Sequence, residues 1–377
     1  METINNYIVF AEEHYNPLGV IRSLGEKGIK PIGIFIKSGP IFASKSKFLS
    51  KVHYVDDRSE GLKILLKEYG DFACKTFIYT CDDTTLEFLD ENYDLLKDKF
   101  VFFNAGEKGK VSKFLNKETI GELAVKYGLN FLESIVVNNG ELPKKIEYPI
   151  ITKAIDSTVG GWKNDMFICN NQEELINAFS KIKSPKVMLQ KYIVKKNEYC
   201  LEGLSFNKGE EIFISIESIY NYKLPMSYSP YMTVNNFSNK NNILPSLKGM
   251  FKEIGFEGIF EIEFLETEDG TLYFGEINFR NSTWSYASTC AGMNLPLLWS
   301  MAMSDKRLPD NYYCEILKPG FTAMVELTDF KERVINRRYS FVKWLHDLNA
   351  CKCKYYIGKN DIKPVLAIVL FRLFNRK

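Results

Sequence analysis

Residues Ile259–Arg280 read IFEIEFLETEDGTLYFGEINFR. Two apolar runs flank the polar turn Glu266–Gly270, which ends in glycine, and this pattern predicts an antiparallel hairpin. Successive side chains of a strand point to opposite faces, so Glu261 and Glu263 are expected on one face of the first strand. On the return strand, one face is expected to carry Leu272, Phe274, Glu276, Asn278 and Arg280.

The acidic side chains of this hairpin predict a cation site. In the simplest pairing register, Glu263 faces the end of the return strand that carries Glu276 and Asn278. Two carboxylates held together raise each other's pKa unless a cation compensates their charge. Magnesium takes oxygen ligands and commonly uses one or two carboxylates plus substrate phosphates, so these three residues fit a metal–nucleotide site. Arg280 would add a fixed cation for phosphate oxygens or a developing oxyanion. The alternative is an exposed, charged sheet face, which is common.

The first hundred residues alternate between strand and helix patterns. Strands are expected at 7–11, 31–36 and 76–80, and helices at 18–26 and 62–69. This alternation predicts a parallel sheet, in which ligand-binding groups follow the carboxyl ends of the strands. There is no GxGxxG, so a dinucleotide site is not supported. The residues expected at the functional edge are Glu12, Glu13, His14, Asp82 and Asp83, of which at least one aspartate is expected to cap the next helix.

From about residue 112 the pattern changes. Helices are expected at 111–127 and 173–181, and a loop of small residues at Asp156–Gly161 follows an apolar strand that contains Lys153. The long strands before and within the hairpin predict antiparallel pairing. The strands expected in this part of the chain are 132–137, 149–154, 186–193, 200–206, 211–219, 259–265 and 271–279.

Composition excludes several classes of protein. The 377 residues are 45% hydrophobic and 25% charged, which predicts two or three folded domains. The net charge of +2 does not indicate a nucleic-acid binder. Eight cysteines without a CxxC and three scattered histidines disfavour a zinc site. The first residues lack a basic signal-peptide region, and no apolar run is long enough to span a membrane. A cytoplasmic protein with reduced cysteines is expected.

The last part of the chain has a different charge. Residues 331–377 carry twelve Lys and Arg but three Asp and Glu, a local balance of +9. Residues 364–374 are apolar on nearly all sides of a predicted helix. Such a helix either packs against the neighbouring domain or contacts an anionic membrane surface or an anionic substrate.

The hairpin resembles the metal-binding signature of the ATP-grasp superfamily, in which E-x-F, a DG turn and E-I-N-x-R follow one another. Glu263, Glu276 and Asn278 match its metal ligands, and Arg280 matches the arginine often found two residues later. Residues 291–296, AGMNLP, are similar to the segment that follows in carboxylate–amine ligases. The resemblance is strong over about 110–300. Short stretches near both ends of the chain are similar to the D-aspartate ligase group.

The resemblance also implies nucleotide-binding residues. Lys117 and Lys153 match the two lysines of the superfamily, although Asn116 stands where an aspartate is usual and Lys113 is a second candidate. Ser157 and Gly160 fall in the implied phosphate-covering lid. The hinge that would hold adenine is implied at Gln190, Lys191, Tyr192 and Ile193, and the ribose carboxylate at Glu198. Glu198 can instead pair with a nearby lysine, His14 can be an ordinary loop residue, and Trp284 and Tyr286 either line an acceptor pocket or only pack.

The implied fold class is α/β, with α+β architecture in the ATP-grasp part. The implied domains are a Rossmann-like pre-ATP-grasp domain at 1–111, an ATP-grasp N-terminal subdomain with its lid at 112–192, a C-terminal subdomain with the metal site at 193–320, and a basic C-terminal extension at 321–377.

The resemblance implies an ATP-dependent carboxylate–amine ligase that works through an acylphosphate and releases ADP and phosphate. ATP and Mg²⁺ would be its cofactors, with Mn²⁺ able to substitute, and Lys153 and Arg280 its catalytic residues. The implied partners are a small-molecule, nucleotide-linked or carrier-linked carboxylate, an amine such as an amino acid, and a second copy in a homodimer. One alternative is a carboxylate–thiol ligase or carboxylase. Another is an inactive nucleotide-binding regulatory module, against which the intact metal-ligand set argues.

Overall fold

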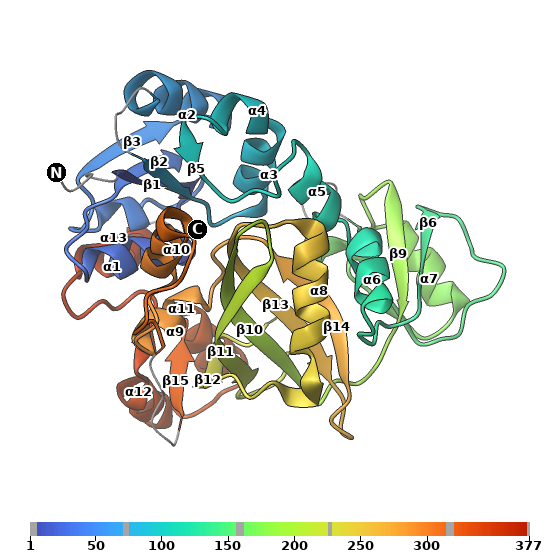
Figure 1. Ribbon diagram of the computed structural model, residues 1–377. Helices are drawn as coiled ribbons and strands as arrows, with labels where there is room; N and C mark the ends of the chain where they lie inside the picture. Colours follow the sequence, from blue (N-terminus) through green and yellow to red (C-terminus); the bar gives the residue numbers. More distant parts are fainter. Residues whose placement is uncertain (1–5, 71–74, 156–161, 225–227, 314–319, 375–377) are drawn as a thin grey trace.

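The computed structural model describes residues 6–70, 75–155, 162–224, 228–313 and 320–374 (Figure 1). Three sheets organise these residues: a parallel sheet near the N-terminus, a small antiparallel sheet, and a long mixed sheet that contains the hairpin. The mixed α/β architecture expected from the sequence is confirmed.

The N-terminal sheet has five parallel strands in the order β3-β2-β1-β4-β5. Strands β1, β2 and β4 are mostly buried runs of apolar residues, as expected for a sheet covered on both faces, whereas the edge strand β3 is largely exposed or half-buried. They are β1 (Asn6–Glu12), β2 (Ile32–Ile36), β3 (Lys51–Val55), β4 (Thr76–Tyr79) and β5 (Phe100–Val101). The helices are α1 (Tyr15–Gly25), η1 (Ala43–Lys45), α2 (Arg58–Ile64), η2 (Leu65–Tyr69), α3 (Asp83–Glu91) and α4 (Tyr93–Leu96).

The first helix starts earlier than predicted. The sequence predicts a loop at Asn16-Pro17 and a helix from residue 18, whereas α1 begins at Tyr15. His14 is its N-cap, and its side chain accepts a hydrogen bond from the Asn16 backbone N–H. Proline is tolerated in a first helical turn because its missing N–H would have no partner there. This placement brings His14 and Tyr15 to the carboxyl edge of the sheet, where both line a cavity.

The middle of the chain forms a four-stranded antiparallel sheet in the order β6-β9-β7-β8. The strands are β6 (Ser134–Asn138), β7 (Ile150–Ala154), β8 (Ile168–Cys169) and β9 (Lys186–Lys191). The helical segments are α5 (Lys110–Leu115), α6 (Lys117–Lys126), η3 (Trp162–Asp165) and α7 (Gln172–Phe179). The expected single helix at 111–127 is wrong, because Asn116 adopts an extended conformation and separates α5 from α6.

The long sheet has the strand order β14-β13-β10-β11-β12-β15-β16. Its strands are β10 (Asn197–Phe206), β11 (Glu211–Tyr220), β12 (Tyr231–Asn235), β13 (Gly258–Glu266), β14 (Leu272–Asn278), β15 (Phe321–Met324) and β16 (Cys353–Lys354). Its helical segments are η4 (Lys240–Asn242), α8 (Leu244–Ile254), α9 (Ser285–Cys290), α10 (Leu295–Asp305), α11 (Glu326–Asp329), η5 (Phe330–Asn336), α12 (Phe341–Ala350) and α13 (Lys363–Phe374).

The segment expected as a basic extension contributes to this architecture. β15 pairs with β12, and β16 pairs with β15, so residues from that segment continue the long sheet. Further along, the buried Arg22 of α1 pairs with Asp361 at 3.2 Å and donates to the carbonyl oxygens of Tyr355 and Tyr356. These contacts fix the chain just before α13 against α1.

An aromatic cluster joins the N-terminal sheet to the long sheet. Trp299 on α10 packs edge-on against Phe77, Tyr79 and Phe103, with ring centroids 4.8 to 5.9 Å apart. The buried Tyr79 hydroxyl donates to the carbonyl oxygen of Pro296 at 2.8 Å. Burying four aromatic rings in edge-to-face contact is strongly favourable, so the edge of the N-terminal sheet is held firmly beside the hairpin.

Candidate active site

A cavity of about 770 Å³ lies where the three sheets meet, and it collects the predicted site residues. Its lining includes Lys117, Lys153, Gln190, Lys191, Tyr192, Ile193, Glu198, Glu263, Glu276, Asn278 and Arg280. Ser157 and Gly160 lie outside the described residues. The sequence thus identified residues on or next to six elements, α6, β7, β9, β10, β13 and β14, that the fold brings to one cavity.

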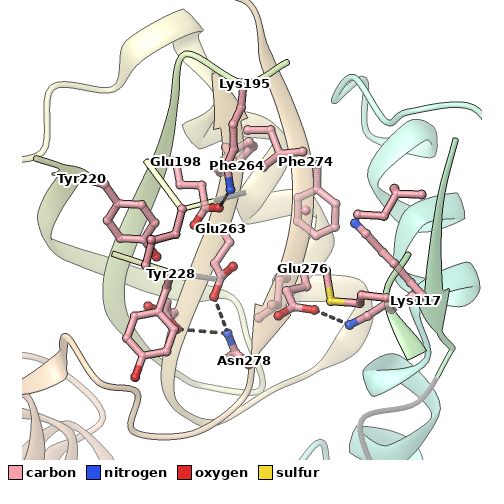
Figure 2. A pocket seen from close by; sticks show the side chains of 18 of the residues that line it. Lys117, Lys195, Glu198, Tyr220, Tyr228, Glu263, Phe264, Phe274, Glu276 and Asn278 are labelled. Carbon is pink, nitrogen blue, oxygen red and sulfur yellow. Dashed lines mark hydrogen bonds and ion pairs between the residues drawn. The ribbon is translucent and has the colours of Figure 1, made fainter. Parts of the chain in front are cut away.

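The two strands form the predicted antiparallel hairpin, and Glu263 faces the end of the return strand that carries Glu276 and Asn278. Glu263 lies opposite Glu276, and Glu261 lies opposite Asn278. A register shift follows, because Phe264 pairs with Phe274 and Gly275 is the extra residue on the return strand. The expected unbroken alternation from Leu272 to Arg280 is therefore interrupted by a bulge. Figure 2 shows Glu263 and Glu276 pointing into the same space from adjacent strands.

The two hairpin carboxylates have opposite electrostatic environments. Burial, together with the nearby Glu276 and Glu261, raises the pKa of Glu263 well above its usual range. The ammonium of Lys117 lowers the pKa of Glu276 to about 2. Lys117 donates to Glu276 from the opposite wall of the cavity (Figure 2). A cation between the carboxylates would relieve the remaining repulsion on Glu263.

The donor set fits a hard cation that also binds substrate phosphates. Within the part of the chain that the structure describes, no three His, Cys, Asp or Glu side chains form a cation site of their own. Two glutamates and one amide leave coordination positions open, which suits Mg²⁺ because it usually keeps phosphate and water ligands. Glu263, Glu276 and Asn278 are the residues that would hold it.

Asn278 links the carboxylates to Arg280. Its Nδ2 donates to Glu261 at 3.0 Å and to Glu263 at 3.2 Å, while its Oδ1 accepts from Arg280 Nη2 at 3.1 Å. To serve as a metal ligand, the amide would turn so that Oδ1 points toward Glu263. Arg280 also forms an ion pair with Asp83, the first residue of α3. This pair raises the pKa of the guanidinium further, so Arg280 is a permanent cation at the cavity wall.

Lys117 owes its position to the break between α5 and α6. The side chain of Asn116 accepts hydrogen bonds from the backbone N–H groups of Glu118 and Thr119 and so caps α6. Asparagine is among the best N-caps, and a cap requires the extended backbone that interrupts the predicted helix. Lys117 becomes the first residue of α6 and points at Glu276. Lys113 is not among the residues that line the cavity.

Lys153 lies on β7 and is held by Gln190 on β9. Its ammonium donates to Gln190 Oε1 at 2.8 Å, and the two strands pair directly. Burial and, to a smaller extent, the charge of Lys117 lower the pKa of Lys153 from 10.5 to about 8. A buried, partly compensated ammonium is well suited to bind a phosphate oxygen, which would restore its charge balance.

The predicted hinge consists of the last two residues of β9 and the two residues that follow them, and all four line the cavity. Lys191 N–H donates to the Glu133 carbonyl oxygen, and Tyr192 N–H donates to the Pro149 carbonyl oxygen. These two N–H groups are therefore already paired within the protein. Apolar side chains beside the hinge give a flat ring suitable surroundings. Those in the cavity lining include Leu132, Ile151, Met166, Leu265 and Phe274.

Glu198 forms an ion pair with Lys195, and both side chains line the cavity. Lysine pairing, given as the alternative to a ribose role, is therefore observed, and the carboxylate still faces the cavity beside Tyr220 (Figure 2). Asp82 caps α3 by accepting from the Thr85 N–H, as expected for at least one of the two aspartates.

The cavity also contains residues to which the sequence assigned no role, including Glu261, Tyr228 and Arg337. Glu261 shares the buried end of the hairpin with Asn278, and Tyr228 lies opposite them, hydrogen-bonded to Tyr15. The alternating pattern of the hairpin did place Glu261 beside Glu263. No local signal indicated Tyr228 or Arg337, which reach the cavity from distant segments.

The two aromatic residues considered for the acceptor pocket differ in position. Trp284 is buried and lines the cavity, whereas the Tyr286 hydroxyl donates to Glu26 and its ring packs on α1.

Comparison with known proteins identifies the fold. Scans against protein-family models and against curated proteins give no match. The structure is similar to an L-amino acid ligase from Bacillus licheniformis, with TM-score 0.64, 15% identity and coverage of 80% of this chain and 76% of that one. It is also similar to N5-carboxyaminoimidazole synthetase from Staphylococcus aureus, with TM-score 0.66, 17% identity and coverage of 90% and 87%.

A third similar structure is the biotin carboxylase domain of 2-oxoglutarate carboxylase from Hydrogenobacter thermophilus, whose title names bound MgADP. Its TM-score is 0.62 at 19% identity, over 82% of this chain and 71% of that one. These neighbours are ATP-grasp enzymes. The overall architecture and the order of its elements therefore show that this chain has the ATP-grasp fold.

Proposed function

We propose that the protein is an ATP-dependent carboxylate–amine ligase that forms an amide or peptide bond and releases ADP and phosphate. The observation that carries this proposal is the convergence of Glu263, Glu276 and Asn278 with Lys117 and Lys153 on one cavity. This arrangement combines two acidic metal ligands with two phosphate-binding cations beside an apolar subsite. The similar structures of an amino acid ligase and of a carboxylase with MgADP support the same chemistry.

In the proposed reaction, ATP lies with its adenine at the hinge and its ribose beside Glu198. Lys117 and Lys153 bind and orient the polyphosphate, and Glu263, Glu276 and Asn278 hold Mg²⁺, for which Mn²⁺ can substitute. The bound cation neutralises phosphate charge. A carboxylate oxygen of the acceptor attacks the γ-phosphorus, and the bond to the ADP oxygen breaks, which gives an acylphosphate and ADP.

The second step joins the amine to the activated acyl group. The amine nitrogen attacks the acyl carbon, and the bond from that carbon to the phosphate oxygen breaks, releasing inorganic phosphate and a proton. Arg280 is placed to stabilise the negative oxygen of the tetrahedral intermediate, because Asp83 fixes its guanidinium at the cavity wall. No protein nucleophile is required. A cytoplasmic location, where ATP is available, belongs to the same proposal.

The proposal is tested by ADP and phosphate release from the purified protein with Mg²⁺ and ATP. Amines would include both enantiomers of the amino acids, and carboxylates would include nucleotide-linked peptides, uronic-acid sugars and bicarbonate. Release that requires one amine and one carboxylate together supports a ligase. Release that requires bicarbonate would instead indicate a carboxylase, and release that requires a thiol would indicate a carboxylate–thiol ligase. Mg²⁺·ATP binding without turnover across the panel would favour a regulatory module.

A further inference from the structure

The C-terminal helix α13 presents an apolar face to solvent. Pro364 and Ile368 are buried against the protein, one helical turn apart. Leu366 is 53% exposed and Leu370 is 51% exposed. The outward face carries Leu366, Val369, Leu370 and Leu373, a spacing of i, i+3, i+4 and i+7. A surface helix normally turns charged residues outward, so this face is opposite to the ordinary pattern.

Exposed apolar side chains also lie beyond these four residues of α13. Phe374, at the end of the described helix, is 82% exposed, and Ile362, just before the helix, is also exposed. Ile41 is exposed in the neighbouring η1 segment, residues 41–47, whose helical turn η1 contacts α13. Contiguous exposed apolar surface on a folded protein marks a site of interaction, whereas single exposed residues need no explanation.

Exposed cations lie on α13 and on the η1 segment, two separate parts of the chain that contact each other. Lys363 and Arg372 are exposed on α13 itself. Lys45 and Lys47 are exposed on the η1 segment, which is tied to the start of α13 through Asp361. Asp361 accepts from the Ser46 hydroxyl at 2.8 Å and from the Lys47 N–H at 3.0 Å. The fold thus brings together four exposed positive charges on the two segments that form this face.

We propose that this face, formed by α13 and the η1 segment, docks on a membrane surface that contains anionic lipids. Twelve residues of helix span about 18 Å, too short for a hydrocarbon core of roughly 30 Å. No helix among the described residues is long and apolar enough to cross a membrane. A helix that lies in the membrane interface typically has an apolar face together with lysine and arginine side chains. Its apolar face enters the interface and its cations contact the headgroups.

Charge favours a lipid surface over a second copy of the chain. In a two-fold symmetric dimer, the same patch would meet itself, so four cations would face four cations. Anionic headgroups complement those charges. This inference is independent of the proposed ligase activity, because neither α13 nor the η1 segment is part of the cavity lining.

The test is co-sedimentation of the full-length protein with vesicles of phosphatidylcholine alone and of phosphatidylcholine mixed with phosphatidylglycerol. The wild-type protein is expected to bind only the mixed vesicles and to be released by salt. The double variant L366S/L370S is expected to lose about tenfold or more in partitioning, since two exposed leucines leave the interface. The charge variant K45Q/K47Q is expected to weaken binding only to anionic vesicles.

The matched control is V125S/I176S, which also removes two exposed apolar side chains, from α6 and α7. These helices lie on the other side of the molecule from α13 (Figure 1). The control is expected to bind vesicles like the wild-type protein. Thermal unfolding of each variant shows whether the fold is retained, and a variant that unfolds is replaced by L366N alone. The proposal is overturned if wild-type protein does not bind anionic vesicles, or if L366S/L370S instead dissociates a dimer measured by light scattering.

Discussion

Lys117 at the start of α6 and Glu276 on β14 form an ion pair across the cavity, although 159 positions separate them in the sequence. The pair joins α6 to the hairpin of the long sheet. Lys117 lowers the pKa of Glu276, while the facing Glu263 has its pKa raised by burial and by like charge. The site therefore holds one carboxylate ready to bind a cation and a second that the cation would ionise.

Replacing Lys117 by methionine is expected to change the pH range in which the metal binds. Lys117 keeps Glu276 ionised down to a pKa of about 2, so its loss returns that pKa toward the ordinary value. The carboxylate then protonates at a higher pH, and Mg²⁺-dependent ATP binding weakens as the pH falls through about 4 to 5. Calorimetric titration of ATP across pH measures this shift. An unchanged pH profile in K117M would argue against the ion pair's role.

The lowered pKa of Lys153 predicts that the affinity for ATP falls at alkaline pH. Its pKa is lowered to about 8, so the ammonium that would bind phosphate is lost as pH rises through that value. The KM for ATP is expected to increase above pH 8 in the wild-type enzyme, by about tenfold per pH unit at the steepest. K153M should have a high KM at every pH, without this transition. A wild-type profile that is flat up to pH 10 would contradict the prediction.

Gln190→Glu is expected to shift the pH at which the KM for ATP begins to rise. Gln190 Oε1 accepts from the Lys153 ammonium at 2.8 Å, so a carboxylate there would stabilise the charged form of Lys153. The rise in KM for ATP should then begin at a higher pH than in the wild-type enzyme. The comparison needs only steady-state kinetics on both proteins. If both transitions coincide, Lys153 is not the titrating group.

The contribution of the α6 N-cap to stability can be separated from its effect on the position of Lys117. Asn116→Ala and Asn171→Ala each remove an N-cap, of α6 and α7 respectively. Each is expected to lower the free energy of unfolding by about 1 kcal/mol, measured by urea denaturation. Only N116A should also raise the KM for ATP, because Lys117 follows the lost cap. Equal kinetic effects in both variants would indicate general destabilisation rather than positioning.

Arg280→Lys is expected to lower kcat by about 100-fold or more while changing the KM for ATP little. The guanidinium binds Asp83 and Asn278 together, and a lysine cannot reproduce both contacts. D83N tests the positioning of Arg280. It should also lower kcat with little change in the KM for ATP, but by a smaller factor. A loss of ATP affinity in R280K would place Arg280 at the nucleotide instead of the acyl group.

Local sequence patterns correctly placed Glu263 at the end of the hairpin that carries Glu276 and Asn278, but its direct pairing with Glu276 depends on a bulge. Lys153 was also predicted from local sequence, because it stands out as a charge within an apolar strand. The break at Asn116 was not predicted, since the apolar spacing of a helix continues on both sides of it. The bulge at Gly275 was missed for a similar reason: alternation alone does not show where a strand gains a residue.

Contacts between distant segments could not be predicted from the sequence. Asp83 and Arg280 are 197 positions apart, and nothing near either residue indicates its partner. The exposure of α13 is a related case. An apolar helix is expected to be buried, but only its side with Pro364 and Ile368 packs on the protein.

The central claim is that the hairpin carboxylates bind a divalent cation together with ATP. Calorimetric titration of ATP into wild-type protein and into E263Q and E276Q, with Mg²⁺ and with a chelator, tests it most directly. We expect wild-type protein to bind ATP tightly only with Mg²⁺, and both variants to lose that dependence while their thermal unfolding stays cooperative. Equal Mg²⁺-dependent binding in wild-type protein and both variants, or no ATP binding by the wild-type protein, would contradict the account.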